Sequence, residues 1–218
     1  MTIMTGLDVQ TEYWDGVART KSFSIPLDLE RFLRIVPKTA RILDYGCGYG
    51  RTCAELSSAG YTDVAGVDIS GEMIRRGLET HPGLRLQKIV PNCLPYPDST
   101  FDAVILFAVL TCIPTDDGQS ALIDEIRRVL RPQGILYVSD FLIQQDERNQ
   151  ARYRQFEGRY GRYGVFELPE GVVLRHHSPE WIGELLRAFK IFETFELDVT
   201  TMNAHRGRVF QHFARKIS

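Results

Sequence analysis

The chain has 218 residues, 44% of them hydrophobic and 25% charged, which is the composition of a globular protein and excludes a disordered one. Lysine and arginine total 26 against 28 for aspartate and glutamate, so the net charge of -2 gives no overall basic field for nucleic acid. The four cysteines form no CxxC pair, the amino terminus lacks the pattern of a signal peptide, and no stretch approaches the ~20 apolar residues of a membrane span. We therefore expect one domain, residues 1–218, in the cytoplasm, without metal, membrane or nucleic acid as a partner. Composition does not address the oligomeric state.

Strand-like and helix-like segments alternate along the first two thirds of the chain. Helices are expected at 27–36, from the glycines near position 50 to Ser58, after a capping Ser70, and around 122–130. Short apolar runs bounded by turn residues predict strands at 41–45, 64–68, 84–89, 101–110 and 134–142. Such alternation indicates an α/β fold: a Rossmann-like doubly wound sheet, mostly parallel, with helices on both faces and ligands beyond the carboxyl ends of the strands.

The last third departs from this alternation. Residues 146–170 are rich in charges and aromatics, read as helical only in their first half, and are expected to form an inserted cap. Ser178 and Pro179 predict the start of a helix that runs to position 189, since serine caps helices and proline suits their first position. Strand-like runs at 191–200 and 209–214 predict a C-terminal antiparallel hairpin.

A glycine-rich loop, Asp44-Tyr45-Gly46-Cys47-Gly48-Tyr49-Gly50, lies between the first strand and the following helix. A backbone without side chains lets a ligand approach the loop closely, although glycines also serve tight turns without any ligand. Asp68 ends the next strand at nearly the ~20-residue spacing of a carboxylate that binds ribose hydroxyls, its alternative role being a helix cap. Asp44 would repel a pyrophosphate and suits a positive amino group, which favours S-adenosylmethionine over NAD.

Four segments, ILDYGCGYGR, VAGVDIS, LPYPDSTFDAVILF and EIRRVLRPQGILYVSD, together resemble the class I S-adenosylmethionine-dependent methyltransferases. They stand in the family's order and spacing, cover about residues 40–140, and the first matches DxGxGxG at every fixed position. The resemblance implies methyl transfer to a small molecule, with S-adenosylhomocysteine as the cofactor product.

The resemblance also implies which residues hold the cofactor. The loop glycines would line its methionine and ribose part, Asp44 its amino end, Asp68 the ribose hydroxyls and Ile69 the adenine. The acidic residue that meets the adenine amino group in many relatives is absent, and Asn92 or the Cys93 backbone is expected in its place. The full expected set is Asp44, Gly46, Cys47, Gly48, Gly50, Asp68, Ile69, Asn92, Cys93 and Phe107.

The acceptor site is expected in the variable parts, because aligning a nucleophile with an activated methyl group demands no invariant catalytic residue. Residues of about 1–36 resemble the family's amino-terminal lid, where Tyr13 and Trp14 would face the sulfonium or simply anchor the segment. In the cap, Tyr153 and Tyr160, with the other aromatics there, would cover a flat substrate.

Two histidines and a group of five arginines lie in or just after the predicted cap. His176 and His177 are candidate general bases, and their alternation along an extended segment implies that at most one faces a cleft. Five arginines at positions 148, 152, 154, 159 and 162 form either a local anion patch or a solvated helix face.

Three alternatives remain open from the sequence. One is a non-catalytic module that binds S-adenosylmethionine, because a fold and a ligand site do not dictate chemistry. Another is a transferase that uses a different part of the same cofactor, as in aminopropyl transfer, although Thr111-Cys112-Ile113 lacks the acid expected at such a site. The weakest is a nicotinamide dehydrogenase, which Asp44 and the spacing GxGxG both disfavour.

Overall fold

A seven-stranded sheet forms the centre of the computed structural model, which describes residues 6–91 and 93–217. The strand order is β3-β2-β1-β4-β5-β9-β8; β3 to β5 are parallel, whereas β9 pairs antiparallel with both β5 and β8. The strands are β1 (Ile42–Tyr45), β2 (Val64–Asp68), β3 (Arg85–Lys88), β4 (Phe101–Phe107), β5 (Leu130–Phe141), β8 (Phe189–Thr200) and β9 (Arg206–Lys216). The predicted mostly parallel sheet with a C-terminal antiparallel hairpin is confirmed.

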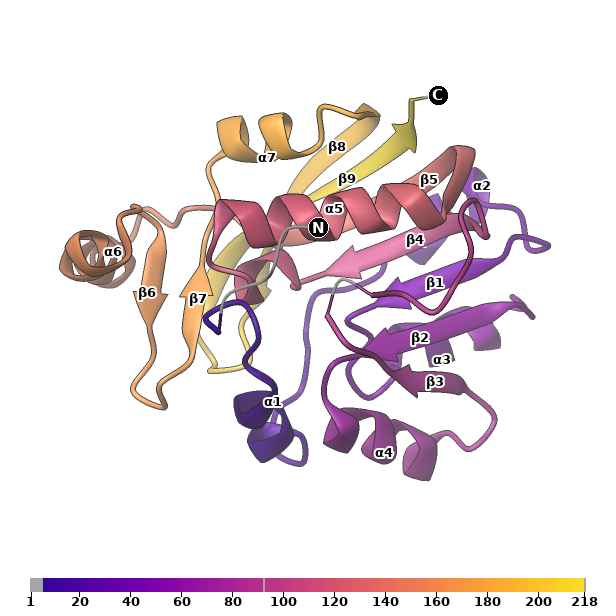
Figure 1. Ribbon diagram of the computed structural model, residues 1–218, viewed down its shortest axis with the longest axis horizontal. Coiled ribbons are helices and arrows are strands. Elements are labelled where there is room, and N and C mark those ends of the chain that lie inside the picture. Colours follow the sequence, from indigo (N-terminus) through magenta and orange to yellow (C-terminus); the bar gives the residue numbers. More distant parts are fainter. Residues whose placement is uncertain (1–5, 92, 218) are drawn as a thin grey trace.

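Helices cover both faces of the sheet (Figure 1). They are α1 (Thr11–Val17), α2 (Leu29–Ile35), α3 (Arg51–Ser58), α4 (Gly71–Thr80), α5 (Asp116–Val129), α6 (Glu147–Tyr160) and α7 (Pro179–Leu185), with a short 3-10 turn, η1, at Leu110–Cys112. Successive strand residues point to opposite faces, so Leu43 packs with α5 and α7 while its neighbour Ile42 packs with α2 and α3. The apolar runs of the central strands are therefore buried from both sides.

Two predicted helix starts show the capping chemistry that marks them. The Ser70 hydroxyl accepts a hydrogen bond from the Met73 amide at 3.1 Å, and the Ser178 hydroxyl accepts one from the Trp181 amide at 3.2 Å. Each satisfies an amide that has no partner inside the helix. The second helix, α7, ends at Leu185 rather than near position 189, because Phe189 already begins β8.

The segment after β5 builds a separate unit at one end of the sheet (Figure 1). It consists of α6 and a small two-stranded antiparallel sheet, β6 (Val165–Glu167) with β7 (Val173–Arg175). The expected helix in the first half of 146–170 is present and extends to Tyr160, where Gly161 ends it with a φ of 68°. The β6–β7 pair was not predicted.

The amino-terminal segment is tied to α4 by specific contacts. The Asp15 carboxylate accepts hydrogen bonds from the Ser70 hydroxyl at 2.6 Å and the Glu72 amide at 3.1 Å. The Arg76 guanidinium donates to the carbonyls of Ala18 and Lys21, at 2.7 and 2.8 Å. These contacts hold α1 and the chain after it over the end of the sheet where β1 and β2 finish. Within the described residues, no helix is long and apolar enough to cross a membrane.

Candidate active site

A cavity of about 770 Å³ opens at the carboxyl ends of the parallel strands. The last residues of β1, β2, β4 and β5, namely Tyr45, Asp68, Phe107 and Phe141, all line it. The strand order reverses between β1 and β4, and open α/β sheets bind ligands beyond such a point. The volume falls in the upper part of the ~300–1,000 Å³ range of small-molecule sites. The cavity can therefore hold a nucleoside cofactor together with a small acceptor.

Gly46 lies where the cavity wall leaves no room for a side chain. Its φ is 73°, and a Cβ atom there would stand 2.3 Å from Cγ2 of Val109. Its amide donates to the Val67 carbonyl at 2.8 Å, which holds the loop against β2. Both the backbone conformation and the close packing require glycine at this position.

The amides of the glycine loop are largely used within the protein. The Gly48 amide donates to Oδ2 of Asp68 at 2.8 Å, and the Gly50 amide donates to the Cys47 carbonyl at 2.9 Å. A pyrophosphate-binding loop instead directs free amides at the ligand. The arrangement agrees with the argument from Asp44 that disfavours a dinucleotide.

Asp68 retains the capacity to accept further hydrogen bonds. Its Oδ2 accepts the Gly48 amide, and its Oδ1 accepts the Ser70 amide at 2.8 Å. A carboxylate offers about four acceptor positions, so Asp68 keeps capacity for ribose hydroxyls beside these two amides and the weaker contact of the Ile69 amide. Burial raises the pKa of Asp68 to about 6, against the effect of these amides, so the group is mostly ionised at neutral pH. The geometry fits a ribose.

Asp44 is a buried carboxylate with little local compensation. It is 3% exposed and accepts a hydrogen bond from the Cys53 thiol, at 3.4 Å from Sγ to Oδ2. Burial raises its pKa to about 7, although the Arg51 charge opposes the shift. A cationic ligand in the cavity would favour the ionised form. The two carboxylates together match the hydroxyls and the positive charge of S-adenosylmethionine, so the residues present fit this cofactor.

The predicted adenine contacts divide into three outcomes. Ile69 lines the cavity, as does Pro91, which was not predicted. Cys93 does not line it: its side chain is exposed, and its amide donates to the Val90 carbonyl at 3.2 Å. Asn92 lies outside the described residues. Of the remaining expected cofactor residues, Cys47 and Phe107 line the cavity, whereas Gly48 and Gly50 shape the loop without lining it.

Ala108, the residue after β4, also lies at the cavity wall. Its φ is 53°, a conformation that costs an alanine free energy. Its amide donates to the Ser139 carbonyl at 2.9 Å, and its own carbonyl accepts the Cys112 thiol at 3.3 Å from Sγ. The backbone is thus held in a strained conformation at the wall of the site.

The amino-terminal segment closes one side of the cavity. Trp14 lines it, whereas Tyr13 does not and packs with the aromatic cluster of the β6–β7 unit. Phe23 also lines it; its ring stacks on Tyr49 with centroids 5.4 Å apart and covers Gly48. Phe23 was not predicted, because a single phenylalanine in an irregular segment carries no pattern.

His177 does not reach the cavity. It is fully buried, its Nε2 stands 2.9 Å from Nε2 of Gln119, and its Nδ1 stands 3.1 Å from the Phe141 carbonyl. The same Gln119 nitrogen donates to the carbonyls of Ile113 and Leu110, at 2.7 and 2.9 Å, and the Gln119 oxygen accepts Trp181 Nε1 at 2.7 Å, so His177 lies within a network of core polar groups. Burial lowers the pKa of His177 to about 3. The expectation that His177 is catalytic is corrected: both nitrogens are used inside the core.

His176 does line the cavity, through a network that sets its tautomer. Its Nδ1 lies 2.5 Å from the Tyr153 hydroxyl, which accepts the Gln144 amide at 3.2 Å. The Tyr153 proton is then directed to Nδ1, which leaves Nε2–H as the donor of the ring. Burial, reinforced by the Arg152 charge, lowers the pKa of His176 well below 6.5. A neutral ring of low basicity does not support the predicted role of general base and favours a hydrogen-bond donor.

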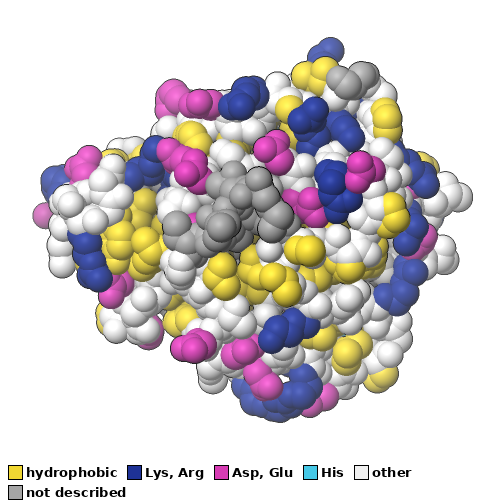
Figure 2. Space-filling model, in the orientation of Figure 1, with side chains coloured by type: hydrophobic (Ala, Val, Ile, Leu, Met, Phe, Trp, Pro, Cys, Tyr) yellow, Lys and Arg dark blue, Asp and Glu magenta, His cyan; other side chains and the backbone are white. Residues whose placement is uncertain are grey.

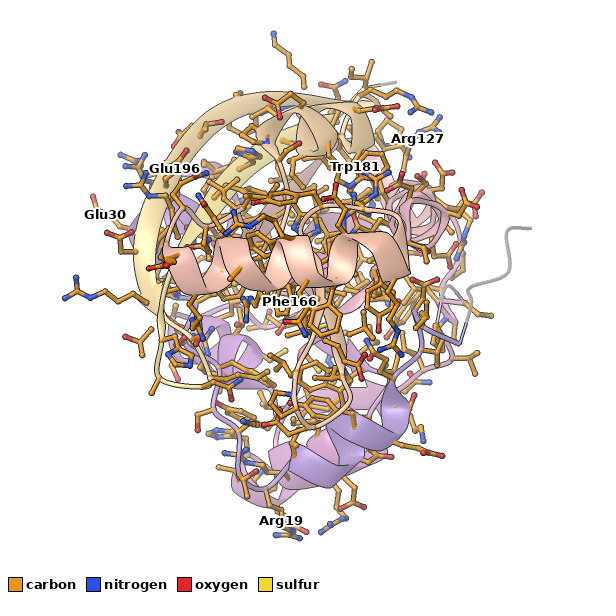
Figure 3. All side chains as sticks on the ribbon, turned by 90° about the vertical axis from the view of Figure 1, so that its left-hand side faces the viewer. Arg19, Glu30, Arg127, Phe166, Trp181 and Glu196 are labelled. Carbon is orange, nitrogen blue, oxygen red and sulfur yellow. The ribbon has the colours of Figure 1, made fainter. Side chains whose placement is uncertain are left out.

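The two predicted substrate tyrosines of the cap play structural parts. Tyr153 is fully buried and orients His176. The Tyr160 hydroxyl donates to Oε2 of Glu167 at 2.8 Å, and neither tyrosine lines the cavity. Their side chains are turned away because α6 packs this face against β6, where Phe166 lies beside the helix (Figure 3). The expectation that Tyr153 and Tyr160 contact the substrate directly is therefore corrected.

Residues of α6, of the β6–β7 turn with the carboxylates of Glu167 and Glu170, and of the C-terminal hairpin also line the cavity. Arg148, Asn149 and Arg152 come from α6, and residues 201–203 and 205–207 come from the β8–β9 turn. The two arginines belong to the arginine-rich segment recognised in the sequence, but Asn149 and the hairpin turn were missed. Among residues 6–91 and 93–217, no group of three His, Cys, Asp or Glu side chains could hold a metal ion.

Comparison with known proteins identifies the family. A model described as a methyltransferase domain matches residues 43–138. The demethylmenaquinone methyltransferase of Beutenbergia cavernae is 31% identical over 82% of this chain and 74% of its own length. The 27-O-demethylrifamycin SV methyltransferase of Amycolatopsis mediterranei is 29% identical over 63% of this chain, which spans 53% of that protein.

A solved structure agrees with the sequence matches. A SAM-dependent methyltransferase from Methanosarcina mazei superposes with a TM-score of 0.80, at 26% identity, over 88% of this chain and 98% of that one. The fold class, the cofactor and the enzyme class predicted from the sequence are thereby confirmed. The chain belongs to the S-adenosylmethionine-dependent methyltransferases.

Proposed function

We propose that the protein methylates an oxygen atom of a small-molecule acceptor bound beside the cofactor in the same cavity. One observation carries the proposal: the cavity that contains Asp44 and Asp68 continues to His176 and the arginines of α6. The names of the two curated relatives, which specify a demethylmenaquinone and a demethylrifamycin, support a small-molecule acceptor. S-adenosylmethionine supplies an activated methyl group on a sulfonium.

The donors at His176 and on α6 favour oxygen as the nucleophile; of the cap carboxylates that line the same cavity, Glu167 is paired with Arg159 at 2.6 Å, and Glu170 is the other. The Nε2–H of His176 and the Arg152 guanidinium are both donors, and Arg152 is also a cation. Donors and positive charge stabilise an oxygen lone pair or an oxyanion and repel a protonated amine. His176 would contact the acceptor directly, whereas Tyr153 would act through it as a positioning residue.

We further propose that residues of about 1–36 act as a lid and those of about 146–170 as a cap. Trp14 and Phe23 line the cavity from the lid, and Arg148, Arg152 and Phe166 line it from the cap. A closed site excludes water from a reactive methyl group and strengthens the electrostatic interactions inside it. The lid would cover the cofactor, and the cap would cover the acceptor.

The distribution of charge on the surface favours a small molecule over a nucleic acid as the methyl acceptor. Figure 2 shows Lys and Arg side chains interspersed with Asp and Glu on the viewed face, without a continuous basic stripe. The net charge of -2 agrees with this distribution. We place the reaction in the cytoplasm, where all four cysteines, which are free thiols here, would stay reduced.

Transfer of radioactive label tests the proposal. The protein is incubated with S-adenosylmethionine labelled in the methyl group and with phenols, alcohols, carboxylic acids and amines, and label in the acceptor is counted. We expect label in an oxygen acceptor, lost in Asp68→Ala and retained in Asp63→Ala, whose carboxylate pairs with Arg85 on the surface. Cofactor binding without transfer to any class would favour the non-catalytic alternative, and transfer to amines alone would contradict oxygen.

A further inference from the structure

One face of α6 is turned toward the cavity. Arg148, Asn149 and Arg152 all line the cavity, and residues three and four apart share a helix face. Figure 1 places α6 at the end of the molecule away from β2, whose last residue is Asp68. The two arginines therefore lie in the part of the cavity distant from the cofactor carboxylates.

The arginines around the cap differ in whether they have a partner. Three of those outside the cavity form ion pairs, Arg159 with Glu167 at 2.6 Å and both Arg162 and Arg175 with Asp116, whereas the exposed Arg154 forms none among the described residues. In the described part of the chain, neither Arg148 nor Arg152 forms an ion pair with a carboxylate, whereas Arg51, which lines the cavity elsewhere, pairs with Glu55 at 3.4 Å. Asp146, whose charge acts on both Arg148 and Arg152, caps α6 by accepting the Asn149 amide at 3.1 Å. Arg148 and Arg152 are thus two cations of the α6 wall without a direct counter-ion, although the cap carboxylates of Glu167 and Glu170 line the same cavity.

Two buried polar atoms in this region also lack a hydrogen-bond partner. Nε of Arg152 is one, although its guanidinium lies over the Phe166 ring at 3.4 Å. Oδ1 of Asn149, a residue that is 1% exposed, is the other. Buried polar atoms without partners are rare and cost free energy. Their presence together at a cavity wall indicates groups arranged for a ligand.

We propose that Arg148, Arg152 and the Nε2–H of His176 bind an anionic oxygen group of the acceptor, so that the preferred acceptors are organic acids carrying a carboxylate or a phosphate. The inference rests on the function proposed above and specifies its substrate class. A planar guanidinium matches both kinds of oxyanion, and the flat Phe166 ring holds that of Arg152 in place. Asn149 Oδ1 would accept a hydroxyl or N–H of the same molecule.

Binding of matched probes tests the inference. The protein saturated with S-adenosylhomocysteine is titrated calorimetrically with 4-hydroxybenzoate, 4-hydroxyphenyl phosphate and the uncharged 4-hydroxybenzamide. We expect at least one anion to bind tenfold or more tightly than the amide, and the stronger anion distinguishes a carboxylate from a phosphate site. Equal binding of the amide and both anions would overturn the inference.

Variants locate the preference on α6. Arg152→Met keeps an unbranched apolar side chain but removes the guanidinium and its charge, and it should remove most of the preference. Arg148→Met/Arg152→Met should abolish it. Arg152→Lys, which keeps the charge, should retain part of it. Arg154→Met, an exposed position of the same helix outside the cavity lining, is the control and should bind like the wild type. A preference that survives in the double variant would also overturn the inference.

A parallel titration with S-adenosylmethionine distinguishes the two proposals. All four variants should bind the cofactor within about threefold of the wild type, because α6 lies away from its carboxylates. Cofactor binding and methyl transfer without a preference for anions would refute only the acid-binding site. Failure of the wild type to bind the cofactor would refute both.

Discussion

Replacement of Asp68 tests the cofactor site most sharply. Its oxygens accept the Gly48 and Ser70 amides, with a weaker contact from the Ile69 amide, and keep acceptor capacity for ribose hydroxyls. Hydrogen bonds to a charged group contribute about 1.5–3 kcal/mol each, so loss of two ribose hydroxyl bonds should cost at least about 3 kcal/mol. Asp68→Ala should therefore raise the Kd for S-adenosylmethionine roughly 100-fold.

The assay is calorimetric titration of the wild type, Asp68→Ala, Asp68→Asn and the surface control Asp63→Ala. Circular dichroism checks that each variant is folded, since the Gly48 and Ser70 amides lose their acceptor in Asp68→Ala. The 2′-deoxy form of S-adenosylhomocysteine completes a double-mutant cycle. The deoxy ligand should bind the wild type more weakly than S-adenosylhomocysteine does, whereas Asp68→Ala should bind the two ligands equally well. Binding of Asp68→Ala within threefold of the wild type, or an additive cycle, would refute the assignment.

Three further variants test the physical account of the fold and loop. The pKa of Asp44 is raised to about 7 in the fold, so its contribution to stability is greatest at low pH and is lost as the pH rises through 7. The free energy of unfolding of Asp44→Asn, relative to that of the wild type, should therefore increase by up to about 4 kcal/mol between pH 4 and 8. A difference in unfolding temperature that does not change with pH would contradict this. Gly46→Ala should lower the unfolding temperature by at least about 3 °C, because its φ of 73° and the 2.3 Å approach to Val109 both oppose a Cβ; an unchanged temperature would mean that the loop relaxes. Ser178→Ala removes the acceptor of the Trp181 amide and should cost about 1 kcal/mol, seen as a 2–4 °C drop with the methyl-transfer rate unchanged; a loss of activity would show that this cap also shapes the site.

Features set by local sequence were predictable. The strands β1, β2 and β4 are apolar because both faces are covered, and the glycine loop is recognisable because its backbone conformation excludes side chains. Asp68 follows from its place at the end of β2. These properties depend on a few neighbouring residues, so the cofactor half of the site could be inferred from the chain alone.

Features set by contacts between distant segments were not predictable. Two adjacent histidines look alike in the sequence, yet His177 is enclosed by Gln119 on α5 while His176 meets the cavity. The Tyr160 hydroxyl donates to Glu167 of β6, a strand that the sequence pattern did not predict. Asn149 lines the cavity from the buried face of α6, which it shares with Tyr153, so its position depends on how that helix packs. The acceptor half of the site depends on how these separate segments meet.

Titration with S-adenosylmethionine and with NAD, in parallel, tests the central claim most directly. Two carboxylates at the cavity and a loop whose Gly48 and Gly50 amides are already used predict binding of S-adenosylmethionine at micromolar concentration and none of NAD. Binding of NAD, or of neither ligand, would contradict the assignment of the cavity.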